Sequence, residues 1–341
     1  MSARIFVAVA VSFVAAVRIA AGPLDEVRAA SSIQNLDLEK LRGGEIANAR
    51  GPLGDFARGV YVESCYFLRA PPPVVIAAMQ KWDPTRHREL EVSAFRDYAL
   101  PSTPAVFNSL ILNSGRPQDR WLIDKTFELA KAGETELHLN AGDMALVRSS
   151  LGQESQSSGH GDAKVSEVWR TILHRRSEAL GTGGLAAVPS YRAADTEIAA
   201  RAEFEALLKM APAIAARFAS LTNGRPFSAA GLAPDSTNMY WEASLVRGHT
   251  GLHNGVLCTR KNANSWQAVD LSYYVSDTYI LSMTLYEIWP SDRGTLLWQI
   301  DFVSAPFHNF GNAVERTFAG RELLKEAAQW IRLFRSDLER R

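Results

Sequence analysis

Five strand-like runs follow one another between residues 239 and 304, with only short connections between them. Their sequences are MYWEASLVR, GVLCTR, WQAVDLSYYV, TYILSMTLYEIW and GTLLWQIDFVS. β-branched and aromatic residues favour strands, and connections this short allow only antiparallel pairing, because a parallel pair needs a crossover of a dozen or more residues. This part of the chain therefore predicts an antiparallel meander, and the other segments must cover its faces.

The last two runs form a predicted hairpin around the turn PSDRG, residues 290–294. If the turn pairs Pro290 with Thr295, the side chains alternate between two faces. The first face collects Leu281, Met283, Leu285, Trp289, Leu296, Trp298, Ile300 and Phe302. The second face collects Ile280, Ser282, Thr284, Tyr286, Ile288, Leu297, Gln299, Asp301 and Val303. Neither face resembles a solvated surface, so we expect both to be covered, the first by the C-terminal helix.

A long amphipathic helix is predicted for residues 312–341, because apolar residues recur there at helical spacing and basic residues gather near the end. Earlier in the chain, the strand-like run 59–70 meets three prolines, Pro71 to Pro73, and a helix-like run follows at once. Proline is favoured in the first turn of a helix and pushes the preceding residue towards extended geometry. Neither flank is polar and of low complexity, as a linker would be. We therefore predict a strand-to-helix corner within one domain.

Helices are predicted through the middle of the chain, at residues 140–151, 163–180 and about 195–221. Asn140 is suited to cap the first of them. Together they form a helical block over about 140–222, inserted in a single α+β domain that spans 59–341. Short strands are predicted before the block, at 89–95, 121–129 and 134–139.

The N-terminus predicts export. A short basic start is followed by thirteen uncharged residues, 5–17, and then by small residues up to Ala21. Thirteen helical residues rise only about 20 Å, which is short of the hydrocarbon core of a bilayer. We interpret 1–21 as a signal peptide and expect a periplasmic or secreted protein. An uncleaved membrane anchor, or a buried helix after a misassigned start, is the alternative. Residues 22–58 are polar and glycine-containing, and we expect a flexible leader.

Composition and motifs exclude several classes of function. The chain has 37 basic and 37 acidic residues, so nothing indicates a nucleic-acid partner. Two cysteines, Cys65 and Cys258, allow one disulfide or two buried free thiols. His249 and His253 lie four residues apart but flank Gly251 in a predicted loop and lack the glutamate of a zinc-protease motif, so no metal is expected. No cofactor is expected either, because the dinucleotide fingerprint is absent, and the serine nucleophile elbow is also missing.

Two acids stand out as candidate site residues. Asp270 and Asp301 each lie in mid-strand between apolar neighbours. A buried carboxylate must find a partner or raise its pKa, and carboxylates with perturbed pKa values concentrate at functional sites. The structural alternative is a salt bridge to an arginine on a neighbouring element. We take Asp270 and Asp301 as candidate acid or base groups, and we predict a ligand-binding set of Tyr273, Thr284, Tyr286, Gln299 and Asp301.

Two parts of the chain resemble the helix-grip fold of the START-like superfamily, which includes polyketide cyclases and lipid-transfer proteins. They are the strand–proline–helix run GVYVESCYFLRAPPPVVIAAMQKWDP and the segment from Tyr240 to Arg335. The resemblance covers about half of the chain after residue 21. It implies a curved antiparallel sheet that grips a long C-terminal helix around a hydrophobic cavity, and it carries over no catalytic residue. The helical block at about 140–222 departs from the family and would be an insertion, which could cap the cavity.

From these features we expect an exported protein that binds a hydrophobic small molecule, lipid-like or isoprenoid-like, between the sheet and the C-terminal helix. One alternative is a cyclase- or hydrolase-type enzyme that uses the same cavity with a buried aspartate as acid or base. Another is an interaction protein of the cell envelope that has no ligand. Peripheral contact with a membrane and the oligomeric state stay open.

Overall fold

The computed structural model describes residues 22–133, 135–152, 159–193, 196–228, 233–306 and 313–340. The predicted signal peptide at 1–21 lies outside these residues. Within the described ranges, no helix combines the length and the apolar character needed to cross a membrane.

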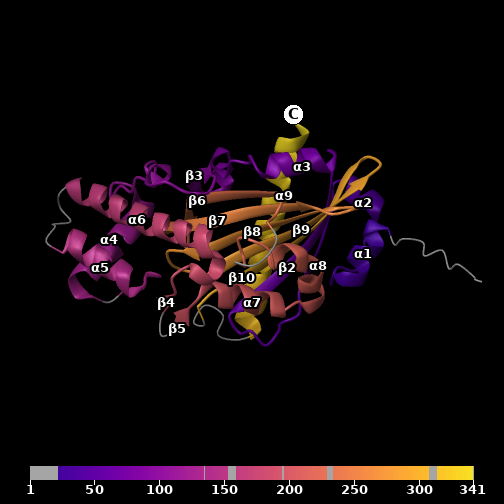
Figure 1. The fold of residues 1–341 in the computed structure, drawn as a ribbon. Coiled ribbons are helices and arrows are strands. Elements are labelled where there is room, and N and C mark those ends of the chain that lie inside the picture. The colour runs from indigo at the N-terminus through magenta and orange to yellow at the C-terminus, as the bar shows by residue number, and fades with distance from the viewer. Residues whose placement is uncertain are drawn as a thin grey trace, which may run out of the picture.

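The chain is α+β and is built on an eight-stranded antiparallel sheet in the order β1-β2-β10-β9-β8-β7-β6-β3 (Figure 1). The predicted meander supplies five adjacent strands, which are β6 (Ser236–Val246), β7 (His249–Lys261), β8 (Trp266–Val275), β9 (Leu281–Ser291) and β10 (Gly294–Ser304). The remaining strands extend it at both edges and are β1 (Ile46–Arg50), β2 (Gly59–Leu68) and β3 (Val92–Tyr98). The antiparallel meander is thus confirmed.

The β9–β10 hairpin pairs Pro290 with Thr295, as predicted, and continues to Ser282 opposite Val303. Its two faces therefore alternate as predicted, but the first face is not covered by the C-terminal helix. The side chains from Leu281 to Phe302 on that face belong to one core with the helices of the middle of the chain. This expectation was wrong because both faces are apolar, and the larger continuous apolar face takes the more extensive helical cover.

The helices that contribute to this core are α4 (Pro117–Ala132), α5 (Ala141–Leu151), α6 (Gly159–Gly183), α7 (Ala200–Lys209) and α8 (Pro212–Thr222). In Figure 1, α7 and α8 lie in front of the strands and α4 to α6 lie beyond the end of the sheet that carries β6 and β7. The C-terminal helix α9 (Ala313–Glu339) passes behind the strands. The helical block therefore covers the face opposite α9 and does not lie over the space beneath α9.

The second face packs against α9 and α3 (Pro72–Met79). Ile288 and Leu297 of the hairpin contact the same apolar cluster as Ile331, Phe334 and Leu338 of α9. The proline corner forms as predicted, with Pro71 extended at the N-cap and Pro72 at the first helical position of α3. The corner thus holds α3 against the C-terminal half of α9.

The segment 22–58 is structured, in contrast to the flexible leader expected. It contains α1 (Pro23–Ala30), α2 (Leu38–Arg42) and β1, and β1 pairs with β2 at the edge of the sheet. Val27 and Leu41 are buried in the main core. The apolar residues of this segment are few, but each helix buries one of them, and burial outweighs the polar composition of the rest.

Other predictions for the middle of the chain need correction. Residues 121–129, predicted as a strand, lie in α4, which begins at Pro117 and ends before Gly133 in the left-handed conformation. The proline start and glycine stop are helix signals that outweigh the local strand propensity. The predicted strand 134–139 forms no named strand within its described residues. The helix predicted over 195–221 is two helices, because Pro212 begins α8.

The remaining described elements are four short helical turns and a small hairpin. The turns are η1 (Pro84–Arg86), η2 (Arg88–Leu90), η3 (Pro104–Phe107) and η4 (Gly184–Ala187), and the hairpin consists of β4 (Tyr191–Ala193) and β5 (Thr196–Ile198). Asn140 caps α5 as predicted, in a capping box with Asp143.

Cys65 and Cys258 are both free and buried, so of the two alternatives left open by the sequence, the structure has two free thiols and no disulfide between them. Burial raises the pKa of each thiol to about 12, which makes both inert.

Candidate functional site

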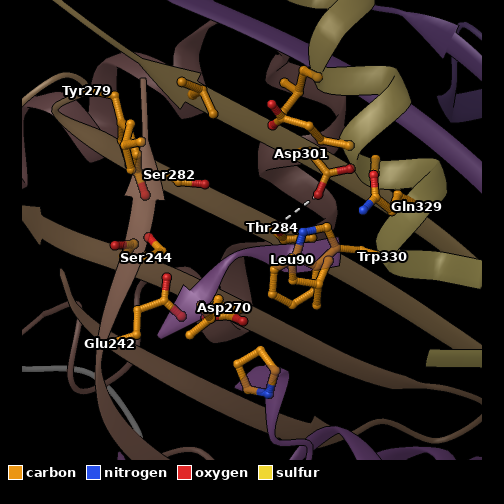
Figure 2. Close-up of a pocket in the computed structure, with 18 of the residues that line it drawn as sticks. Leu90, Glu242, Ser244, Asp270, Tyr279, Ser282, Thr284, Asp301, Gln329 and Trp330 are labelled. Atoms are coloured by element: carbon orange, nitrogen blue, oxygen red, sulfur yellow. Dashed lines mark hydrogen bonds between the residues drawn. The ribbon is translucent and has the colours of Figure 1, made fainter. Parts of the chain in front are cut away.

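A cleft of about 1150 Å³ lies between α9 and the second face of the sheet. We call it the α9 cleft. Its wall on α9 is mainly apolar and includes Val314, Phe318, Leu323, Ala327, Trp330, Ile331 and Phe334. Figure 2 shows Trp330 and Gln329 of α9 facing side chains that project from the strands. This volume is slightly above the usual range of ligand sites, about 300–1000 Å³.

The sheet side of the α9 cleft is polar in its centre. Asp270, Thr284 and Asp301 lie directly opposite one another on β8, β9 and β10. Because neighbouring strands are about 4.8 Å apart, the backbones of the two aspartates are about 10 Å apart. Ser272 and Ser282 form the next cross-strand pair along the same face. A molecule in the cleft would therefore lie with an apolar helix on one side and hydroxyl and carboxyl groups on the other.

Asp301 is held by its neighbours on the sheet. The Thr284 hydroxyl donates to its Oδ1 at 2.9 Å, and the Gln299 amide donates to Oδ1 and Oδ2 at 2.9 and 3.0 Å. Gln299 is in turn fixed by the Tyr66 hydroxyl, which donates to its Oε1 at 3.0 Å. Asp301 is only 8 % exposed, and burial raises its pKa to about 6 although the two donors oppose the shift.

Asp270 is held by a tyrosine from β6. The Tyr240 hydroxyl donates to Asp270 Oδ1 at 2.8 Å. Burial raises the pKa of Asp270 to about 6, against the effect of this hydrogen bond. Tyr240 reaches Asp270 because its ring lies flat over Gly255, the residue opposite it on β7, where a Cβ would come within 2.0 Å of the ring. Glycine is required there for the close approach of the ring.

Replacing Gly255 with alanine is expected to destabilise the protein by about 1–3 kcal/mol, because the new methyl group overlaps the Tyr240 ring and the ring must move. The ring's displacement would also remove the hydroxyl from Asp270. Urea unfolding measures the loss. Gly54→Ala is the matched control, since its Cβ would meet nothing closer than 3.9 Å. Equal stability of the two variants would show that the ring contact carries no constraint.

A third acid, Glu242, lies on β6 next to a hydrogen-bonded histidine. Burial, followed by the charge of Asp270, raises the pKa of Glu242 to about 7. Its Oε1 is 3.9 Å from Nδ1 of His253, the residue opposite it on β7. His253 is 1 % exposed, and its ring nitrogens contact the Ser244 hydroxyl at 2.8 Å and the Tyr279 hydroxyl at 2.7 Å. Burial lowers the pKa of His253 to about 4, so the ring is neutral at physiological pH.

The two histidines that the sequence analysis placed in a loop both lie on β7. His249 Nε2 contacts Asp277 Oδ2 at 2.5 Å, and its ring stacks on Trp121 of α4 at 3.8 Å between centroids. His253 contacts Ser244 and Tyr279, two residues that line the α9 cleft. In the described part of the chain, no group of three or more His, Cys, Asp or Glu side chains is arranged to hold a metal ion.

Four of the five predicted ligand-binding residues line the α9 cleft, namely Thr284, Tyr286, Gln299 and Asp301. Asp270 lines it as well. Tyr273 does not, because side chains alternate along β8 and Tyr273 therefore points to the face opposite Asp270 and Ser272. It is 1 % exposed in the core beneath the helical block. Tyr273 therefore lies outside the α9 cleft, and its role in ligand binding stays a prediction.

Several cleft residues were missed from the sequence. Glu242 carries the same signal as Asp270, an acid between apolar neighbours in a strand run, and could have been found by the same reasoning. Tyr240, Ser272 and Tyr279 also line the cleft. The glutamate on α9, Glu326, has a pKa raised by burial and then by the charge of Glu322. Glu326 was missed because the sequence analysis placed α9 on the other face of the sheet.

Substitution of Asp301 by asparagine is expected to change how stability depends on pH. The folded pKa of about 6 lies above the ordinary 3.8, so the folded state retains a proton that the unfolded chain has released. The stability that this group contributes is therefore present below about pH 4 and is lost as the pH rises through 6. Asp301→Asn should flatten the decline and exceed the wild type by on the order of 2 kcal/mol at pH 8.

Urea unfolding at several pH values between 4 and 8 provides the measurement for Asp301→Asn. The matched control is Glu205→Gln, an exposed acid of α7 on the other side of the sheet. Parallel stability profiles for Asp301→Asn and the wild type would mean that Asp301 titrates as an ordinary solvated acid.

The salt bridge considered as the alternative for the two aspartates is not formed. Within the described ranges, neither Asp270 nor Asp301 pairs with a lysine or arginine, and their polar contacts are the uncharged donors Tyr240, Thr284 and Gln299. A comparison of the chain with protein-family models, with curated proteins and with solved structures finds no match.

Proposed function

We propose that this protein binds a hydrophobic small molecule, lipid-like or isoprenoid-like, in the α9 cleft. The observation that carries the proposal is the cleft itself, about 1150 Å³ between an apolar helix wall and a sheet with sparse polar groups. Such a combination of apolar lining and a few fixed polar groups is the usual composition of a small-molecule site. A protein that serves only as an interaction partner would have no use for an internal space of this size.

The arrangement also supports the START-like resemblance as a proposal. A long C-terminal helix lies against one face of an antiparallel sheet, and a proline-led helix follows an early strand. The side chains of Val314 and Phe318 in the first turns of α9 line the cleft and are 78 % and 62 % exposed. They provide an apolar path by which a hydrophobic molecule would enter from a membrane surface. Export to the periplasm or out of the cell belongs to the same proposal.

Native mass spectrometry tests the binding proposal. The full-length protein is purified without detergent and measured alone and after incubation with a neutral fluorophore of low polarity, Nile red. We expect one bound molecule per chain, either retained from the host cell or added. A spectrum with the bare chain alone under both conditions would contradict the proposal.

A second candidate is a cyclase- or hydrolase-type enzyme in the same cleft. The observation that favours it is the pKa values of about 6, 6 and 7 for Asp270, Asp301 and Glu242, which allow proton transfer in either direction near neutral pH. For an enzyme, a compound that occupies the cleft should change mass with time. Asp301→Asn should then keep binding that compound while the conversion stops. If the wild type releases the bound compound unchanged, the enzyme proposal is contradicted and the binding proposal stands.

A further inference from the structure

The α9 cleft has an uneven distribution of charge. Nine of its described lining residues are acidic, and one, Arg247, is basic. Arg247 is an exposed residue at the β6–β7 turn, whereas three of the acids, Glu242, Asp270 and Asp301, project from the strands into the centre of the space (Figure 2). Glu322 and Glu326 of α9 add two carboxyl groups from the opposite wall. The polar part of the cleft is therefore complementary to positive charge.

The central acids are not explained by the fold alone. Asp301 is more than nine-tenths buried, and a buried carboxylate is costly unless a positive charge or several donors compensate it. No described lysine or arginine supplies that charge to Asp270 or Asp301. A bound proton neutralises each group at mildly acidic pH. A cation from outside the chain would neutralise them together.

A second observation also indicates a ligand with a polar head. Ser272 lies on the cleft side of β8, two residues after Asp270 and opposite Ser282 on β9. Its hydroxyl belongs to a residue that is only 8 % exposed, lies near the Tyr279 hydroxyl and makes no hydrogen bond of normal length within the described residues. Buried hydroxyls are nearly always satisfied, so one without a partner beside a cavity marks a place for a ligand group.

A metal ion does not fit these groups. Within the part of the chain that the structure describes, no three ligating side chains converge. The acids are instead spread across the strands, with about 10 Å between the backbones of Asp270 and Asp301. An organic cation matches this spacing better, because an ammonium group has three donors and an attached apolar body can lie along the α9 wall.

We propose that the α9 cleft selects hydrophobic molecules that carry a protonated amine, with the ammonium group among Asp270, Asp301 and Glu242 and the apolar body against α9. This inference rests on the proposed function and names the ligand class. It is distinct from that function because a cleft for neutral lipids would show no preference for a cation.

Displacement of Nile red from the full-length protein at pH 7.5 tests the proposal. Three competitors with the same chain length are compared, decylamine, decanol and decanoate. We expect decylamine to displace the fluorophore at concentrations at least tenfold below those of decanol, about the contribution of one charge-assisted hydrogen bond. Decanoate should be the weakest of the three, because its charge meets the carboxylates.

A double variant and a control complete the experiment. In Asp270→Asn/Asp301→Asn, the advantage of decylamine over decanol, measured within the same protein, should fall to about threefold or less. Glu205→Gln on α7 should keep the wild-type ratio. Equal displacement by amine and alcohol, or an unchanged ratio in the double variant, would overturn the amine preference and leave the binding proposal standing. Failure of Nile red and all three competitors to bind would overturn both.

Discussion

Replacing Ser282 with tryptophan is expected to weaken the binding of Nile red by about a hundredfold. Ser282 lies on β9 and projects into the middle of the α9 cleft, between Tyr279 and Asp301 in Figure 2. An indole ring there fills the space that a ligand would occupy. A competing molecule must then give up burial of a group the size of a leucine or phenylalanine side chain, which is worth about 1.5–3 kcal/mol. A fluorescence titration gives the dissociation constant.

The fold should survive this change, because Ser282 is only half-buried and the new ring enters open space. The matched control is Ser149→Trp, the same substitution at an exposed position of α5, which packs on α4 and α6 away from the cleft. This control should bind Nile red like the wild type. If Ser282→Trp binds as tightly as Ser149→Trp, the fluorophore does not occupy the cleft.

The second large effect is expected at Arg176, and it concerns stability. Arg176 of α6 is 1 % exposed and its Nη2 is 2.6 Å from Asp143 Oδ2 on α5. Its guanidinium group also lies 3.9 Å from the centre of the Tyr274 ring on β8. Arg176→Ala leaves Asp143 as an uncompensated buried charge and should cost about 3–5 kcal/mol in urea unfolding. The pair joins α5 to α6, and the contact of Arg176 with Tyr274 joins both helices to the sheet, so the loss should be global.

A double variant separates the lost pair from the lost volume. In Arg176→Met/Asp143→Asn the buried charge is absent on both sides, the methionine fills most of the space, and asparagine can still accept a hydrogen bond as part of the helix cap. We expect it to be clearly more stable than Arg176→Ala. If Arg176→Ala unfolds with a free energy within about 1 kcal/mol of the wild type, the buried pair does not hold the helical block.

Local signals predicted much of the scaffold. The turn at 290–294 determined the register of β9 and β10, and the prolines at 71–73 determined the corner between β2 and α3. Both succeed because turn and proline geometry are properties of a few neighbouring residues. The same local reasoning failed at 121–129. There the prediction relied on strand propensity and overlooked Pro117 and Gly133, which mark the start and the end of a helix.

The sequence predicted which strand face lines the cleft, but it did not predict which helix covers that face. Thr284, Tyr286, Gln299 and Asp301 share a face by alternation alone, and that face lines the cleft. Which helix covers which face depends on contacts between distant segments, and alternation says nothing about it. The mixed face, with hydroxyls and carboxyls, is the one that stays partly open beneath α9, while the more apolar face is closed by the helical block.

Photo-crosslinking shows whether a hydrophobic ligand occupies the α9 cleft. A decanol analogue with a diazirine on its chain is irradiated with the full-length protein, and the labelled peptides are mapped by mass spectrometry. We expect labels on α9 around Trp330 and on the facing segments of β8, β9 and β10, all reduced by an excess of Nile red. Labels confined to the helices on the other face, or labels that Nile red does not reduce, would contradict it.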